Sequence, residues 1–219
     1  MKKWFCAVFV AACAVYSSAQ EIVTARAFFD SVSAVYATVR DYEADVDIKA
    51  NRTNMRGRVY FKRPNLLRID FSNPSDQVIC FNGDMLTIYL PGSSAILNQS
   101  VQNTGVGMAS AQGLSLMSKY YSVAYETGSE PVPLSEEDST PVVKLRLGRK
   151  NTSEAFRYIK MAVDPKSKLI RRIEGITPQG ESFVFLFRGY ELNKGISDNK
   201  FVYDAPSSAN NYNNFLFNE

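Results

Sequence analysis

The sequence predicts a mainly β protein in which one N-terminal helix precedes a large antiparallel sheet. Three observations lead to this fold class. The spacing of apolar residues is helical up to residue 39, and it becomes alternating from residue 42 onward. Short turns rich in Asn, Pro and Gly separate the alternating segments, as in sheets built from hairpins.

Residues 21–39 form the one clear helix in the sequence. Apolar side chains recur there at steps of seven, three, four and three, which places them on one helical face. This face predicts a helix that packs on the sheet. Its members are Ile22, Phe29, Val32, Tyr36 and Val39.

The alternating segments predict a sheet so wide that it must curl, close or be covered. Asn82-Gly83, between two apolar runs, is a strong hairpin signal. The candidate strands are 42–50, 55–63, 66–71, 77–81, 85–90, 94–101, 141–148, 156–163, 168–176, 182–192 and 199–203.

Three segments depart from this pattern. Residues 104–119 are rich in small residues, and they predict a short, glycine-loosened helix with an apolar face. Residues 126–140 are polar and contain proline, so we expect an exposed loop. The tail 207–219 is rich in Asn and Ser but ends in apolar residues, and we expect it to be partly ordered against the sheet.

The first 19 residues have the three parts of a secretory signal peptide: a basic pair, an apolar run and a small-residue site. The apolar run is shorter than the roughly 20 residues that a membrane span needs. We therefore expect export with cleavage between Ala19 and Gln20. Val10-Ala11-Ala12-Cys13 is similar to a lipobox, which leaves a lipid anchor on Cys13 as an alternative.

Cleavage would take away two of the 25 basic residues and leave 23 against 22 acidic residues. A near-neutral chain lacks the basic patch of nucleic-acid-binding proteins, so we expect no nucleic-acid partner. Cys80 would be the one remaining cysteine, which excludes a disulfide framework. Its apolar neighbours predict a buried side chain.

The sequence contains no histidine, which excludes a histidine-based catalytic triad and a histidine metal site. Paired carboxylates remain possible candidates for glycoside hydrolysis, at Asp45 and Asp47 or at Glu136 and Glu137. Such neighbours are typical of a solvated surface. We accordingly expect no catalytic residue, no metal and no cofactor.

Strand parity gathers apolar side chains on one face of several candidate strands. In 55–63 this face also carries Arg63. One interpretation is an ordinary core beneath the helix; the other is an uncovered apolar concavity that binds lipid. The aligned residues are Val59 and Phe61; Leu67, Ile69 and Phe71; Leu86, Ile88 and Leu90; and Phe183, Phe185 and Phe187.

The order of several motifs resembles the LolA family of periplasmic lipoprotein chaperones. Gly57 precedes a strand that ends in Lys62-Arg63-Pro64, and a second segment runs from Asn82-Gly83 to Tyr89-Leu90-Pro91. Phe201 to Pro206 is similar to the closing motif of the family. The similarity spans about residues 22–206, whereas the 104–119 segment and the Asn-rich tail depart from the family pattern.

The resemblance implies an unclosed, strongly curved antiparallel β half-barrel whose concave face is covered by helices. It implies a signal peptide at 1–19, a carrier domain at 20–206 and a tail at 207–219. The carrier would be a soluble, periplasmic monomer that shields the acyl chains of lipoproteins in a hydrophobic cavity. It would take them from an inner-membrane lipoprotein-releasing transporter to the outer membrane, where a receptor is a candidate acceptor.

The resemblance also assigns roles to single residues. Arg63 matches the family arginine that hydrogen-bonds the lid and holds it closed. Two alternatives share the fold: an envelope-stress sensor, and a lipid-binding lipoprotein anchored at Cys13. The residues expected to line the cavity are Val59, Phe61, Leu67, Ile69, Phe71, Leu86, Ile88, Leu90, Leu114 and Met117.

The signal-peptide interpretation predicts a mature chain that starts at Gln20. Intact-mass analysis and N-terminal sequencing of the protein from the cell envelope should find residues 1–19 missing. A chain that keeps Met1 or Lys2 would contradict cleavage. A diacylated Cys13 would favour the anchored lipoprotein over the soluble carrier.

Overall fold

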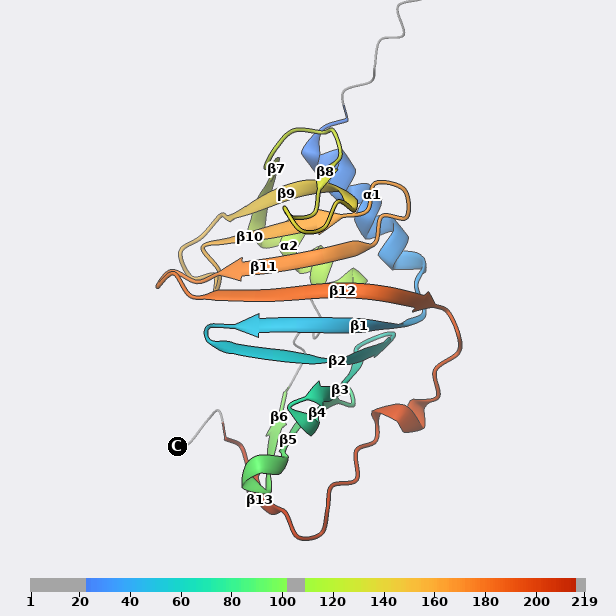
Figure 1. Cartoon of the computed structure of the whole chain (residues 1–219), viewed down its shortest axis with the longest axis vertical. Coiled ribbons are helices and arrows are strands. Elements are labelled where there is room, and N and C mark those ends of the chain that lie inside the picture. Colours follow the sequence, from blue (N-terminus) through green and yellow to red (C-terminus); the bar gives the residue numbers. More distant parts are fainter. Residues whose placement is uncertain (1–22, 102–108, 216–219) are drawn as a thin grey trace, which may run out of the picture.

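The computed structural model describes residues 23–101 and 109–215, and it shows one open sheet with two helices on the same side (Figure 1). The helices are α1 (Ala25–Thr38) and α2 (Ala111–Tyr120), with short 3-10 helices η1 (Pro91–Ser93) and η2 (Asp198–Phe201). The strands are β1 (Asp41–Ala50), β2 (Thr53–Lys62), β3 (Leu66–Asn73), β4 (Ser75–Phe81), β5 (Met85–Leu90), β6 (Ala95–Ser100), β7 (Tyr121–Tyr125), β8 (Val132–Pro133), β9 (Pro141–Arg149), β10 (Tyr158–Val163), β11 (Ile170–Ile176), β12 (Ser182–Leu192) and β13 (Asn210–Asn213).

The strands follow the order β13-β6-β5-β4-β3-β2-β1-β12-β11-β10-β9-β7, with β8 paired to β9 outside this path. Among the described pairs, β13 alone runs parallel to its neighbour, β6. The first strand of the chain therefore pairs with a strand from its far end, β12, at the centre of the sheet. The mainly β class and the open antiparallel sheet that the sequence predicts are confirmed.

Helix α1 is shorter than the predicted 21–39. Thr24 caps it, because its Oγ1 accepts a hydrogen bond from Ala27 N at 3.1 Å, and the last helical residue is Thr38. Phe29 and Val32 have no exposed surface, and Tyr36 is 2% exposed. The predicted apolar face is thus the buried face, apart from Ile22, which lies outside the described residues.

Helix α2 confirms the short helix predicted within 104–119, although residues 104–108 lie outside the described part of the chain. Ser110 Oγ accepts from Gly113 N at 3.0 Å and caps the first turn. Gly113, Leu114 and Met117 are its buried residues. Neither α1 nor α2 has the length and hydropathy of a membrane-spanning helix.

The Asn82-Gly83 hairpin is present between β4 and β5. Asn82 Oδ1 accepts from Asp84 N at 3.1 Å and Met85 N at 2.9 Å, and Gly83 has φ +109°. A side chain rarely adopts that backbone conformation, which accounts for glycine at this position. The turn sets the register that places Phe81 opposite Leu86.

The predicted strand at 199–203 is wrong, because Asp198–Phe201 is the 3-10 helix η2, capped by the Ser197 hydroxyl at 3.3 Å from Asn199 N. It belongs to residues 193–209, here named the C-terminal strap. Phe201 is 1% exposed, and its carbonyl accepts from the Cys80 thiol at 3.2 Å. The expected burial of Cys80 is thereby explained: the strap covers it.

The strap leads to β13, which extends the sheet beyond β6 (Figure 1). Asn98 Nδ2 donates to Asn211 Oδ1 at 2.9 Å across this pair. The expected partial ordering of the tail against the sheet is confirmed for Asn210–Asn213. The predicted exposed loop at 126–140 contains the short strand β8 and buries Leu134 against Val142.

A tyrosine network fastens α1 to the inner face of the sheet. The Tyr190 hydroxyl donates to Ile170 O at 2.9 Å, and the Tyr36 hydroxyl accepts from Ile170 N at 3.1 Å. The two hydroxyl oxygens are 3.4 Å apart. Burial raises the pKa of Tyr36 to about 12, and it raises the pKa of Tyr190 well above its ordinary value.

This network predicts alkaline sensitivity. Tyrosine in an unfolded chain has a pKa of about 10. The stabilising contribution of Tyr36 should therefore be complete below about pH 10 and decline as pH rises towards 12. Replacing Tyr36 by Phe leaves Ile170 N–H without its acceptor and should lower the free energy of unfolding by about 1–3 kcal/mol at neutral pH. The same replacement should flatten the alkaline decline in urea titrations.

Tyr212→Phe is the matched control, because this ring is 53% exposed. It should leave both the neutral-pH stability and the alkaline decline unchanged. An alkaline decline as steep in Tyr36→Phe as in the unaltered protein would contradict the role of the network.

Candidate functional site

The strand residues expected to line a cavity lie on one face of the sheet. Residues that are directly opposite in neighbouring strands share a face. Val59 is opposite Ile69, Ile69 is opposite Ile79, and Ile79 is opposite Ile88. A second row runs in the same way through Phe61, Leu67, Phe81 and Leu86.

This inner face has a filled part under the two helices. Val59, Phe61, Ile69 and Phe71 are buried in one cluster with Leu114 and Met117 of α2. Phe29, Val32 and Leu114 show no exposed surface. For these positions the ordinary-core interpretation describes the structure, because side chains of α1 and α2 already occupy the space.

The remaining part of the inner face is only half-buried. Leu67, Leu86, Ile88 and Leu90 keep exposed surface, and so does Ile79, which lies between Ile69 and Ile88. We name Leu67, Ile79, Leu86 and Ile88 the apolar row. It continues the core without a polar break, from the strands under the helices to β5. The sequence candidates did not include Ile79, although its parity in 77–81 would have found it.

Gly57 lets β2 and β3 approach each other beside this face. A Cβ at Gly57 would lie 2.4 Å from Asp70 O, closer than real Cβ atoms come to backbone. The register of the two strands shifts between Arg56 and Gly57. Any larger residue would push the strands apart and disturb Phe71, which is opposite Gly57.

Arg63 reaches the C-terminal end of α1. Its guanidinium donates to Val39 O, with Nε at 3.2 Å and a terminal nitrogen at 2.8 Å, and it also donates to Ala37 O. The last carbonyls of a helix have no partner within the helix, and a cation at this end is favourable. Arg63 therefore lies where the resemblance places it, and its action as a latch stays a prediction.

The prediction that strand parity places Arg63 on the apolar face of 55–63 is wrong. Strand β2 ends at Lys62, and the turn through Pro64 carries Arg63 to the rim, where the residue is exposed. The parity argument assumed that the strand continued through residue 63. A cavity of about 240 Å³ lies at this rim, lined by Tyr36, Ala37, Val39, Phe61, Arg63, Pro64, Ala111 and Gln112. It brings the end of α1, the end of β2 and the start of α2 together.

The outer face of the sheet is charged, and the candidate carboxylates of Asp45 and Asp47 form ion pairs there. Asp45 pairs with Arg58 at 3.0 Å, and Asp47 pairs with Arg56 at 2.9 Å and with Arg188. Burial acts to raise the pKa of Asp47, but the hydrogen bonds from the two arginines outweigh it and hold the pKa below its ordinary value. A carboxylate whose pKa is lowered by two arginines is unsuited to serve as a general acid.

A cavity of about 580 Å³ on the outer face is lined by these ion-paired groups, including Asp45, Asp47, Arg56, Arg58 and Arg188. Its charges are a poor match for an acyl chain. Glu136 and Glu137 are exposed in the loop before β9, as expected of surface residues. Within residues 23–101 and 109–215, no group of His, Cys, Asp and Glu side chains is arranged to hold a metal ion.

Comparison with known proteins agrees with this geometry. An outer-membrane lipoprotein carrier protein of Pseudomonas putida (strain GB-1) is 22% identical over 153 residues, which are 70% of this chain and 69% of that protein. An uncharacterized conserved protein of Thermus thermophilus is similar in structure, with a TM-score of 0.53, 14% identity, and coverage of 85% of this chain and 96% of that one.

A chain of the Pseudomonas aeruginosa MucA/MucB complex has a TM-score of 0.50 and 9% identity, over 82% of this chain and 61% of that one. At these identities the two structural likenesses show a shared fold. The family model for the outer membrane lipoprotein carrier protein LolA matches residues 45–204. Since this match covers well over half of the sequence, the chain belongs to the LolA family.

Proposed function

We propose that this protein is a periplasmic carrier that shelters the acyl chains of lipoproteins against the apolar row. The observation that carries the proposal is the half-buried state of Leu67, Ile79, Leu86 and Ile88 on the inner face. An apolar strip that is continuous with the core and still open to solvent favours contact with an apolar ligand. Family membership supports a lipoprotein as the bearer of that ligand.

The acyl chains would lie along the apolar row, because the filled part of the inner face has no free space. Placing a chain under α1 would require displacing Phe29 and Val32, which are fully buried. The row extends from β3 to β5 across the strand direction, so a chain lying on it would contact one side chain on each of β3 and β4 and two on β5. Its half-buried side chains would lose their remaining exposed surface on binding, which is the source of affinity.

Release of the acyl chain requires that the closed, empty state of the protein be stable enough to compete with the loaded state. The hydrogen bonds from Arg63 to Ala37 O and Val39 O hold the end of α1 against the end of β2. If α1 moves away when cargo enters, these bonds break, and their recovery favours the departure of cargo. The exposed position of Arg63 makes this contribution modest and reversible.

The proposed route starts at an inner-membrane lipoprotein-releasing transporter and ends at the outer membrane, with a receptor there as a candidate acceptor. The signal-peptide pattern of residues 1–19 supports export to the periplasm. The near balance of 25 basic and 22 acidic residues in the whole chain fits a carrier that does not bind one membrane surface firmly through charge.

Replacing Ile88 by Glu should weaken binding of a fluorescent long-chain fatty acid by at least about tenfold. The new carboxylate would have to be desolvated beneath the bound chain, which is costly without a partner. Fluorescence titration of the purified protein measures the effect.

Thr87→Glu is the matched control, since Thr87 is the preceding residue of β5 and faces the opposite side, where it is opposite Asn98. Its affinity for the fatty acid should stay within about twofold of the unaltered protein, a shift below about 0.5 kcal/mol. Equal weakening by both variants, or by neither, would contradict binding on the apolar row.

Replacing Arg63 by Leu should give a protein that folds and loads acylated cargo but hands it on poorly. The variant loses the hydrogen bonds that favour the closed, empty state, so cargo release should slow by about threefold to tenfold. A purified transfer assay that measures loading and release separately provides the test.

Arg40→Leu is a suitable control, because Arg40 is exposed nearby and its side chain is not among the donors to the end of α1. Release from this variant should match that of the unaltered protein. If Arg63→Leu released cargo as fast as the unaltered protein, Arg63 would not be a latch.

A further inference from the structure

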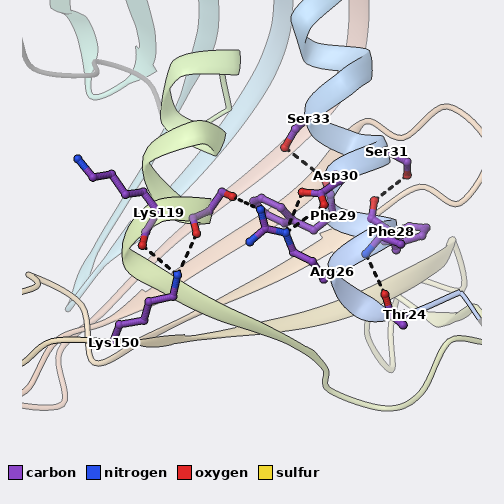
Figure 2. A network of polar contacts seen from close by, with 11 residues as sticks. Thr24, Arg26, Phe28, Phe29, Asp30, Ser31, Ser33, Lys119 and Lys150 are labelled. Carbon is purple, nitrogen blue, oxygen red and sulfur yellow. Dashed lines mark hydrogen bonds and ion pairs between the residues drawn. The ribbon is translucent and has the colours of Figure 1, made fainter.

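The two helices are held near the β7 end of the sheet. Both contact β7 as well as each other. Figure 2 shows polar contacts that hold them there: Lys150, directly after β9, donates from Nζ to Lys119 O at 3.0 Å, and Arg26 of α1 donates to Ser118 Oγ at 2.6 Å. The apolar row lies towards the opposite end of the strand order, where β6 and β13 follow it (Figure 1).

The apolar row continues through β6. Leu97 is opposite Ile88, so the two side chains share the inner face, and Leu97 is half-buried like its neighbour. The adjacent line of side chains, which passes through Leu86, meets the polar Gln99 on β6. The line through Ile79, Ile88 and Leu97 is thus the one that stays apolar through this strand.

Strand β13 adds one more side chain to this line. Tyr212 is in register with Leu97 in the parallel pair of β13 and β6, so the two side chains share the inner face. The register is fixed on the outer face, where Asn98 Nδ2 donates to Asn211 Oδ1 at 2.9 Å, and along the backbone, where Asn214 N donates to Asn98 O at 2.8 Å. A shift by one residue would turn Tyr212 to the outer face.

Tyr212 suits the end of a binding site for an apolar chain. The residue is 53% exposed although its neighbours on the same line are apolar. A tyrosine is favourable where an apolar surface meets water, because its ring is apolar and its hydroxyl stays hydrated. Strand β13 lies beyond residues 45–204, which match the family, so the family pattern assigns no role to Tyr212.

The fifth strand brings the row to the length of a long acyl chain. Neighbouring strands are about 4.8 Å apart, so the path from Leu67 on β3 to Leu97 on β6 is about 14 Å long, and the path to Tyr212 on β13 is about 19 Å long. An extended acyl chain advances about 1.3 Å per carbon, because its C–C bonds are about 1.5 Å long. The shorter path therefore matches about 12 carbons and the longer path about 16 carbons.

We propose that Tyr212 is a binding residue for the acyl chain and sets the chain length that the protein prefers. Its ring extends the apolar row by one strand and contacts the last methylenes of a chain of about 16 carbons, which a chain of about 12 carbons does not reach. This inference rests on the proposed acyl-chain binding and adds to it a preferred length of chain.

The test measures how well dodecanoate and hexadecanoate displace a fluorescent long-chain fatty acid from the purified protein. The unaltered protein should bind hexadecanoate more tightly than dodecanoate. Tyr212→Thr should weaken hexadecanoate binding by about threefold to tenfold, because about four methylenes lose an apolar contact on one side. Dodecanoate binding should change by less than about twofold. Threonine is common in strands, so β13 should keep its pairing in this variant.

Tyr212→Phe keeps the ring and should bind both fatty acids as the unaltered protein does. Asn213→Ser is the matched control, because Asn213 is the next residue of β13, is exposed and lies on the outer face in register with Asn98. This variant should also leave both affinities unchanged.

Equal weakening of both fatty acids in Tyr212→Thr, no weakening there, or the same loss in Asn213→Ser would overturn the role of Tyr212. A loss in Tyr212→Phe as large as in Tyr212→Thr would overturn contact through the ring. An unaltered protein that bound neither fatty acid would contradict the proposed function itself. Binding of both with no length-dependent loss would contradict the chain-length role alone, so the two failures are distinguishable.

Discussion

The architecture depends on one constraint: the apolar inner face of the sheet is wider than α1 and α2, the helices of the described residues, can cover. A helix of 14 residues and one of 10 residues are set against a path of strands that runs from β13 to β7. Where α1 and α2 reach, Phe29, Val32 and Leu114 complete a dry core with Val59 and Phe61. Where they do not, the same strand parity continues into the half-buried apolar row.

Because the helices cannot be held by packing alone along the full face, polar contacts at their ends become important. Helix α2 buries few apolar side chains, chiefly Leu114 and Met117. Packing of so small a face does not fix the orientation of the helix on the sheet, so polar contacts are needed as well. Cations placed against terminal carbonyls supply that orientation with little loss of reversibility, since exposed contacts are individually weak. The outer face differs from the inner face. There the C-terminal strap covers part of the sheet and buries Phe201, and ion pairs join neighbouring strands.

Some strands of this fold are determined by the local sequence pattern, and others by pairing with strands that are distant in the sequence. Apart from 199–203, which is the 3-10 helix η2, the segments with period-two alternation are strands whose ends lie within a few residues of the predicted ones, because alternation directly indicates which face is buried. Asn210–Asn213 consists mainly of asparagine, which is uncommon in strands. This segment is a strand because it pairs with β6, and a local sequence pattern cannot predict that pairing. Tyr121–Tyr125 does alternate, with Tyr121, Val123 and Tyr125 in phase, but the run is short and follows directly on a helix. The predicted strand 55–63 was one residue longer than β2, which ends at Lys62. This difference is enough to place the Arg63 side chain at the rim and not on the apolar face.

A half-filled face also suits the energetics of a carrier. At about 0.8 kcal/mol per buried CH₂, one fully enclosed chain of about 16 carbons would contribute about 12 kcal/mol, which corresponds to nanomolar affinity for each chain. Two or three such chains would bind too tightly to be handed on. The apolar row covers one side of a chain and leaves the other side uncovered, so only part of that energy is gained. Shortening the row or filling it with larger side chains would lower affinity, whereas a rigid cover would raise it and slow release.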